Sequence, residues 1–108
     1  MGETPMALYV HATIKIKPGK LFEAYELLGR IVPEMEKGGW KLVAAYQGLI
    51  GHTSTIVDIW EVPDANAVPA LMGSLAANPK MADVAPKLLD LMAEEEFLQV
   101  MVKAPYSP

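Results

Sequence analysis

Residues 53–62 carry the strongest strand signal in the chain. The run Thr-Ser-Thr-Ile-Val-Asp-Ile-Trp-Glu-Val is rich in β-branched residues, follows the turn residues Gly48 and Gly51, and ends at Pro63. Apolar residues occupy both faces of its middle, which is typical of a strand that is covered on both sides of a sheet. The exception is Asp58, a carboxylate among apolar neighbours that must be paired, hydrated or functional.

The composition limits the classes of protein to consider. A chain of 108 residues is the length of one domain, 1–108, and 52% hydrophobic residues is a high share for so small a domain, which favours a buried interface or an apolar pocket. The net charge of −4, with Arg30 as the single arginine and no basic cluster, disfavours nucleic acid as a partner.

The sequence lacks the residues and motifs that several kinds of site and cellular location require. Without cysteine there is no disulfide, thiol nucleophile or thiolate metal ligand. His11 and His52 stand far apart with no ligand motif around them, and Gly48 and Gly51 fit no phosphate-binding loop, so we expect neither a metal nor a nucleotide cofactor. With no signal peptide and no apolar run of membrane-spanning length, we expect a cytoplasmic protein that does not contact membranes.

Hydrophobic periodicity divides the chain into alternating strand patterns and helical patterns. Pro33 interrupts the first helical pattern, so we expect a kink or break near residues 30–32. Glycines in the link 48–52 predict an antiparallel hairpin between the second and third strands. The expected elements are strand 6–17, helix 20–37, strand 40–47 with Trp40, Leu42, Ala44 and Tyr46 on one face, strand 53–62, helix 65–77, helix 80–96 and strand 97–103.

This order predicts an α+β domain of the ferredoxin-like βαββαβ type. It would have a four-stranded antiparallel sheet with its helices on one face. The other face would remain open and apolar, and a second copy is the simplest cover. We therefore expect a homodimer in which two sheet faces close into a dimeric α+β barrel.

With that order in place, the chain resembles the NIPSNAP family of the dimeric α+β barrel superfamily over nearly its whole length. The residues that carry the resemblance are Tyr9, Lys17-Pro18-Gly19-Lys20, Pro33, the run 36–43 (Glu-Lys-Gly-Gly-Trp-Lys-Leu-Val), Gly48, Gly51, the run 57–61 (Val-Asp-Ile-Trp-Glu) and Asn78-Pro79-Lys80, which is similar to the family's Asp-Pro-Trp region.

The resemblance implies a fold and a dimer, and suggests a place for a ligand. Superfamily relatives include cofactor-free monooxygenases, lactone isomerases, dehydratases and haem-using enzymes, which place small ligands between the sheet and the helices. A haem bound by His11 or His52 is open on that basis, but nothing in the sequence singles out either histidine. The family commonly has His at the position of Asp58 and Arg in the following helix, so no family role is transferred to these positions.

His11 and Asp58 are the candidate catalytic acid or base. His11 stands on the polar face of its strand and could transfer protons near neutral pH, or it could be a hydrogen-bonded interface residue. An apolar strand would raise the pKa of Asp58 and make it a better proton acceptor, unless Asp58 forms an ion pair with Lys15 or Lys41. If both side chains share one face of the sheet, they would form an acid–base pair.

Aromatic and amide side chains supply candidates for binding. Tyr9, Tyr46 and Trp60 could line an apolar pocket with a phenol to orient a carbonyl group, or could be ordinary core residues. Gln47 and His52 flank the hairpin and could form a rim or be simply solvated. A flexible cavity wall or core filler is the expected role of the methionines Met35, Met72, Met81, Met92 and Met101.

The sequence thus predicts a protein that binds a small apolar organic molecule between sheet and helices. If it is an enzyme, we expect a cofactor-free isomerase, dehydratase or monooxygenase with His11 or Asp58 as the base and Tyr46 or Tyr9 as the hydrogen-bond donor. The alternative is a non-catalytic protein-interaction module. A ligand-sized cavity at His11 or Asp58 distinguishes the two hypotheses.

Overall fold

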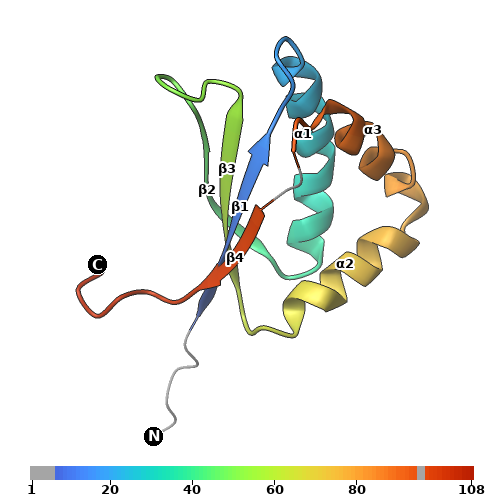
Figure 1. The fold of residues 1–108 in the computed structure, drawn as a ribbon. Coiled ribbons are helices and arrows are strands. Elements are labelled where there is room, and N and C mark those ends of the chain that lie inside the picture. The colour runs from blue at the N-terminus through green and yellow to red at the C-terminus, as the bar shows by residue number, and fades with distance from the viewer. Residues whose placement is uncertain (1–6, 95–96) are drawn as a thin grey trace, which may run out of the picture.

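The computed structural model describes residues 7–94 and 97–108 and shows four strands beside three α-helices (Figure 1). The predicted order of strands and helices is confirmed. In chain order the elements are β1 (Leu8–Lys15), α1 (Leu21–Lys37), β2 (Lys41–Gln47), β3 (Thr55–Val62), α2 (Ala67–Ala77), the short 3-10 helix η1 (Pro79–Met81), α3 (Val84–Leu91) and β4 (Phe97–Met101).

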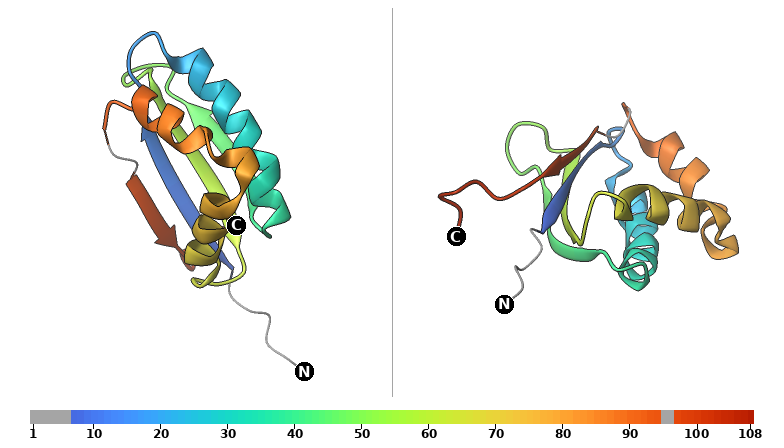
Figure 2. Two further views of the ribbon diagram at one scale, coloured as in Figure 1. Left: turned by 90° about the vertical axis from the view of Figure 1, so that its right-hand side faces the viewer. Right: turned by 90° about the horizontal axis from the view of Figure 1, so that it is seen from below.

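The four strands form one antiparallel sheet in the order β2-β3-β1-β4. Strand β3 lies inside the sheet between β1 and β2, as its apolar sequence predicted, but the helices cover only one of its two faces (Figure 2). All the helices cover one face, so the molecule has two layers and the other face of the sheet is uncovered (Figure 2). This is the predicted ferredoxin-like α+β architecture.

Strict alternation along β1 and β3 decides which side chains face the helices. Even-numbered residues such as Val10, Ile14, Trp60 and Val62 are buried against the helices, whereas odd-numbered residues point to the open face. We call these the inner face and the outer face. Trp40 closes one end of the core, where its ring meets that of Trp60 edge to face at 6.0 Å.

Two helix predictions need correction. Helix α1 runs through Pro33 without a break; because Pro33 is on the exposed side, the backbone carbonyl that loses its partner can turn to water. The predicted helix 80–96 is instead η1 followed by the shorter α3. Asn78 accepts a hydrogen bond from the Lys80 amide and starts η1, and Met92 leaves helical geometry to form a bridge with Ile16. Glu95 and Glu96, the predicted end of that helix, lie outside the described residues.

The β2–β3 hairpin is confirmed, but the predicted faces of β2 are partly wrong. A bulge between Leu42 and Ala44 inserts an extra residue, so that Leu42 lies opposite Trp60 while Ala44 lies opposite Ile59. Leu42 therefore faces the helices, and Ala44 and Tyr46 are switched to the outer face. A pure period of two could not reveal this inserted residue.

The turn at the end of β2 explains why glycine is needed there. A Cβ on Gly48 would overlap the backbone carbonyl of His52, and Gly51 has a positive φ of 90°. On the helical side, Arg30 of α1 donates hydrogen bonds to both carboxylate oxygens of Asp83, at 2.9 and 3.0 Å, and so ties α1 to the start of α3. In the described part of the chain, none of the helices has the length and apolar character to cross a bilayer.

Candidate functional site

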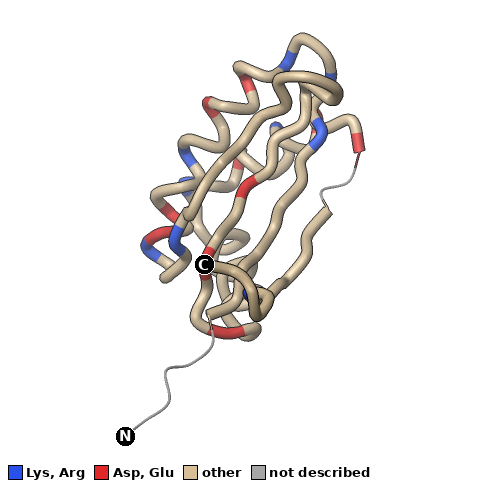
Figure 3. The backbone as a smooth tube through the Cα atoms, turned by 90° about the vertical axis from the view of Figure 1, so that its left-hand side faces the viewer, with Lys and Arg blue, Asp and Glu red and all other residues tan. Residues whose placement is uncertain are grey.

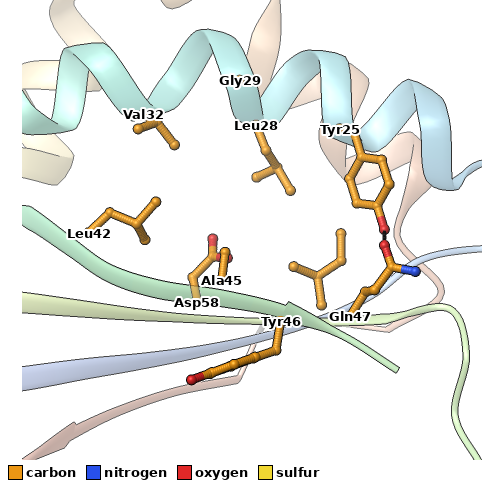
Figure 4. A pocket seen from close by; sticks show the side chains of 10 residues that line it. Tyr25, Leu28, Gly29, Val32, Leu42, Ala45, Tyr46, Gln47 and Asp58 are labelled. Carbon is orange, nitrogen blue, oxygen red and sulfur yellow. Dashed lines mark hydrogen bonds between the residues drawn. The ribbon is translucent and has the colours of Figure 1, made fainter. Parts of the chain in front are cut away.

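A cavity of about 200 Å³ opens between helix α1 and strands β2 and β3 (Figure 4). Its walls are mainly apolar, and its few polar groups come from Tyr25, Gln47 and Asp58. We call it the Asp58 cavity, and its lining residues are Tyr25, Leu28, Gly29, Val32, Leu42, Ala45, Tyr46, Gln47, Ile56 and Asp58. An apolar pocket with a few polar groups is typical of a site for a small organic molecule.

Asp58 is the charged centre of this cavity. Its side chain points from β3 toward α1, with Ala45 and Leu42 beside it (Figure 4). The residue is 7% exposed, and burial raises the pKa of its carboxyl group above the ordinary value, because the charged form loses contact with water. A carboxylate with a raised pKa is a stronger base than one on the surface, as a proton-transfer residue requires.

The alternative interpretation, an ion pair of Asp58 with Lys15 or Lys41, is not observed. Lys15 binds Glu94 at 3.4 Å, and Lys41 lies opposite Glu61 in the strand register. Among residues 7–94 and 97–108, no side chain hydrogen-bonds to Asp58 or forms an ion pair with it. Its carboxyl group therefore faces the cavity without a compensating protein partner.

His11 does not join Asp58. The two strands are neighbours, but Ala12 is the residue opposite Asp58, while His11 lies opposite Ile59. His11 is therefore on the outer face and Asp58 on the inner face. The condition for an acid–base pair within one chain is not met, and the sequence could not have given this register.

The two tyrosines predicted to donate hydrogen bonds also direct their rings away from the cavity, although Tyr46 borders the cavity at its position on β2 (Figure 4). Tyr46 is 61% exposed on the outer face because of the bulge in β2, and Figure 4 shows its ring directed to the far side of the sheet. Tyr9 is on the outer face too, where its hydroxyl donates to Glu61 Oε1 at 3.4 Å and Lys103 Nζ lies 5.7 Å from the centre of its ring. Neither side chain can orient a molecule beside Asp58 in the same chain.

Gln47 does belong to the cavity, together with Tyr25 of α1, which was not among the predicted site residues. The Tyr25 hydroxyl donates a hydrogen bond to Gln47 Oε1, which links α1 to β2 at one end of the cavity (Figure 4). The available signal was a tyrosine on the apolar stripe of α1, where its hydroxyl needs a partner when it is packed against the sheet.

Trp60 lies on the inner face, but it lines a second space. This inner cavity, of about 130 Å³, is enclosed by the sheet and the three helices and also reaches Asp58. Asp58 and Leu28 line both spaces, so they form the partition between them. The lining residues of the inner cavity are Val10, Ala12, Ile14, Leu28, Ile31, Met35, Trp40, Asp58, Trp60, Met72, Leu75, Leu88 and Leu98.

The remaining candidates are spread over the molecule. His52 is exposed in the β2–β3 loop, away from the Asp58 cavity. Met35, Met81 and Met92 are buried core residues, whereas Met72 lines the inner cavity and Met101 is on the outer edge strand. Within the described ranges, no group of three or more His, Asp or Glu side chains could hold a metal ion.

Comparison with known families shows which family the chain belongs to. The sequence model of the NIPSNAP family matches residues 9–108. The chain belongs to the NIPSNAP family. The resemblance drawn from the sequence is thereby confirmed, while the comparison with curated protein sequences found no match.

Solved structures of other NIPSNAP proteins have the same fold. A NIPSNAP family protein of unknown function from Agrobacterium tumefaciens is 22% identical with a TM-score of 0.83, and the alignment covers 98% of this chain and 96% of that one. An uncharacterized NIPSNAP domain protein from Burkholderia xenovorans is 20% identical with a TM-score of 0.77, covering 94% and 98% of the two chains.

The fold is shared with a further group of proteins. A putative antibiotic biosynthesis monooxygenase from Caulobacter crescentus is 11% identical to this NIPSNAP protein, with a TM-score of 0.73 and coverage of 94% of this chain and 92% of that chain. At this identity the likeness concerns the fold, because one fold can carry many chemistries.

Proposed function

We propose that this NIPSNAP protein binds a small, largely apolar carbonyl compound in the Asp58 cavity and transfers a proton with Asp58, without a cofactor. The observation that carries the proposal is a buried carboxylate, without a protein partner in the described chain, on the wall of an apolar cavity. A buried charge without a partner costs stability, so its presence favours a functional role.

The proposed step is removal of a proton from the carbon next to a carbonyl group. The carboxylate of Asp58 takes the proton, and the electron pair of the C–H bond moves into an enolate. In a β,γ-unsaturated carbonyl compound, return of the proton from Asp58 to the γ-carbon gives the conjugated isomer. In a β-hydroxy carbonyl compound, the C–O bond to the β-hydroxyl breaks, the protonated Asp58 supplies the proton that makes it water, and a C=C bond forms. The fold shared with a putative antibiotic biosynthesis monooxygenase supports a third course, in which the enolate carbon reduces dioxygen, the co-reactant, and forms a C–OOH group that loses water to leave a second carbonyl group.

Tyr25 and Gln47 are the proposed polar partners of the substrate. Their hydrogen-bonded side chains lie on the wall of the same cavity as Asp58, and the Gln47 amide also carries N–H donors. A donor near the carbonyl oxygen would stabilise the enolate as its charge develops. These residues replace Tyr46 and Tyr9 in the role of hydrogen-bond donor.

We also propose that the protein is a homodimer formed through the outer sheet face. Charged residues are few along the strands (Figure 3), and those at outer-face positions of β1, β2 and β3 are Lys15, Lys41 and Glu61. Tyr46, Val57, Ile59 and Phe97 place apolar groups there, and Phe97 is 58% exposed in the single chain. Apolar side chains gathered on one open sheet face are typical of an interface, and a second copy with the same face would cover it.

The proposed chemistry can be tested before the natural substrate is known. Small methyl ketones are incubated with the protein in D₂O, and deuterium incorporation next to the carbonyl is followed by proton NMR. The wild type should accelerate incorporation, and Asp58→Asn should reduce the acceleration by about 10²-fold or more, the usual contribution of a general base. Asp90→Asn, a carboxylate on α3 outside the Asp58 cavity, is the matched control.

Binding to the cavity is checked with a blocking variant. Ala45 lines the Asp58 cavity from β2 and is exposed, so Ala45→Trp fills the space without disturbing the core. Ketone contacts measured by saturation-transfer NMR should weaken in this variant. Equal incorporation by the wild type, Asp58→Asn and Ala45→Trp would overturn the proposal.

A further inference from the structure

A third space lies on the far side of the helices. This groove, of about 430 Å³, runs between α2 and α3 over α1, and we call it the helix groove. Its lining has no charged or aromatic side chain, and consists of Ile31, Met72, Leu75, Ala76, Met81, Ala82, Val84, Ala85 and Leu88. Aliphatic groups and two flexible methionines make a surface that adapts to saturated chains.

The helix groove and the inner cavity share part of their walls. Ile31, Met72, Leu75 and Leu88 line both spaces, as Leu28 and Asp58 line both the inner cavity and the Asp58 cavity. The three spaces therefore follow one another from Gln47 at the end of β2, past Asp58, to Ala85 of α3. The residues shared by neighbouring spaces include unbranched Met72 and leucines, and rotation of these side chains is what would join the spaces.

The volumes indicate that one ligand uses more than one space. Sites for small molecules usually enclose about 300–1,000 Å³. The Asp58 cavity, at about 200 Å³, and the inner cavity, at about 130 Å³, each fall below that range, whereas the helix groove reaches it but has no polar group to orient a ligand. A ligand with one polar end and one long apolar end would fit the Asp58 cavity with its polar end and the other two spaces with its apolar end.

We infer that the ligand is a carbonyl compound with a linear saturated chain, whose carbonyl end lies beside Asp58 and whose chain runs through the inner cavity into the helix groove. This inference rests on the proposed function and adds the substrate class to it. A linear chain is favoured over a fused ring system because single side chains such as Leu28 and Met72 separate neighbouring spaces, and a slender chain needs the smallest displacement of them. The carbonyl end is placed at Asp58 because Tyr25, Gln47 and Asp58 bring three polar side chains to one cavity, whereas the inner cavity adds only the indole groups of Trp40 and Trp60.

The first test is the dependence of affinity on chain length. The probes are methyl ethyl, methyl butyl, methyl hexyl and methyl octyl ketone, whose dissociation constants are measured by NMR titration of the full chain. Each methylene that enters an apolar space should raise the affinity about threefold to fourfold, until the groove is filled. An octyl ketone that binds the wild type no more tightly than the ethyl ketone would overturn the inference and leave the proposed proton transfer standing.

Matched substitutions test whether the alkyl chain of the ketone lies in the helix groove. Ala76 and Ala85 are exposed and line the helix groove, so Ala76→Trp or Ala85→Trp fills it, while Ala70→Trp places the same bulk on α2 outside the groove. We expect the advantage of the octyl ketone to vanish in Ala76→Trp and Ala85→Trp and to persist in Ala70→Trp. Affinity for the ethyl ketone should be unchanged in all three. The inference would be contradicted if the octyl ketone kept its higher affinity in Ala76→Trp and Ala85→Trp as well as in Ala70→Trp.

The orientation of the ligand is read from intermolecular nuclear Overhauser effects. The terminal methyl of the octyl chain should contact Met81 and Ala85, and the acetyl methyl should contact Leu28 and Ala45. The reverse pattern, or both ends in the helix groove, would overturn the inference. Failure of the proposed function appears separately, as deuterium incorporation that Asp58→Asn does not lower even though the chain-length dependence is present.

Discussion

His11 and Asp58 lie on neighbouring antiparallel strands but point to opposite faces of the sheet, because Ala12 occupies the position opposite Asp58. The sheet therefore separates the two residues that a sequence reader would most readily pair. Asp58 faces the cavity under α1, and His11 faces the open side that we propose to be a dimer interface.

Replacing Asp58 by the uncharged isostere should stabilise the fold at neutral pH. The pKa of Asp58 is raised in the folded state by burial, so the ionised carboxylate costs stability once the pH rises through that folded pKa. Below the pKa of the unfolded chain both states are protonated and the penalty is absent. We therefore expect Asp58→Asn to raise Tm at pH 7, and the gain to shrink as the pH falls toward 3; calorimetry across this range measures it.

A gain in stability combined with a loss of proton transfer would show that Asp58 is retained for function. A lower Tm for Asp58→Asn at pH 7 would contradict the assigned burial penalty. Asp90→Asn serves again as the control and should show no comparable gain at neutral pH, because Asp90 is exposed.

His11 should be dispensable for chemistry in the Asp58 cavity. Because its side chain is on the outer face, His11→Ala should leave deuterium incorporation into methyl ketones unchanged, in contrast to the loss of about 10²-fold or more expected for Asp58→Asn. Rates per folded protein are compared after a circular-dichroism check of both variants. A loss in His11→Ala as large as in Asp58→Asn would mean that protons pass through the outer face.

A charged substitution on the outer face tests whether a second copy of the protein covers that face. Ile59 lies on that face opposite His11 and Ala44, so Ile59→Lys would place an ammonium group inside the proposed dimer interface. We expect analytical ultracentrifugation to show a dimer for the wild type and a single chain for Ile59→Lys. Phe22→Lys, at an 83% exposed position on α1, is the control that should remain dimeric. A wild type that sediments as a single chain contradicts the proposed dimer.

The two tryptophans at the end of the core should dominate its stability. Trp60 is 2% exposed and packs against Trp40, so Trp60→Ala leaves a large void in the sheet–helix interface. Substitutions of this kind cost about 3–5 kcal/mol of unfolding free energy, which urea denaturation can measure. Tyr106→Ala, at a 92% exposed position, should change the free energy by less than about 0.5 kcal/mol. Equal effects of the two substitutions would mean that Trp60 is not a core residue.

The sequence was sufficient for the architecture because β1 alternates with a period of two and β3 is rich in β-branched residues between clear turn signals. Val10, Ile14, Trp60 and Val62 are buried where alternation puts them, and the apolar run around Asp58 does lie inside the sheet. The NIPSNAP family followed from motifs distributed along the same elements. Local patterns of this kind are encoded by nearest neighbours and need no knowledge of distant contacts.

The site was harder to predict because it depends on register and on one inserted residue. A slip of one position decides whether His11 or Ala12 lies opposite Asp58, and no local pattern fixes that choice. The bulge in β2 moved Tyr46 to the outer face, while Gln47 stayed in the cavity. Tyr25 was overlooked as a site residue because its partner is distant in the sequence.

The most direct test of the account is the pKa of Asp58 in the folded protein. Carbon-13 NMR of the side-chain carboxyl groups, recorded from pH 2 to 8, gives the titration of each aspartate, and the signal missing from Asp58→Asn identifies the one at position 58. The account predicts a midpoint above the ordinary value of 3.8, because the carboxyl group is buried in an apolar cavity. A midpoint at or below 3.8 would mean that Asp58 is hydrated or paired, and would contradict its assignment as the proton-transfer residue.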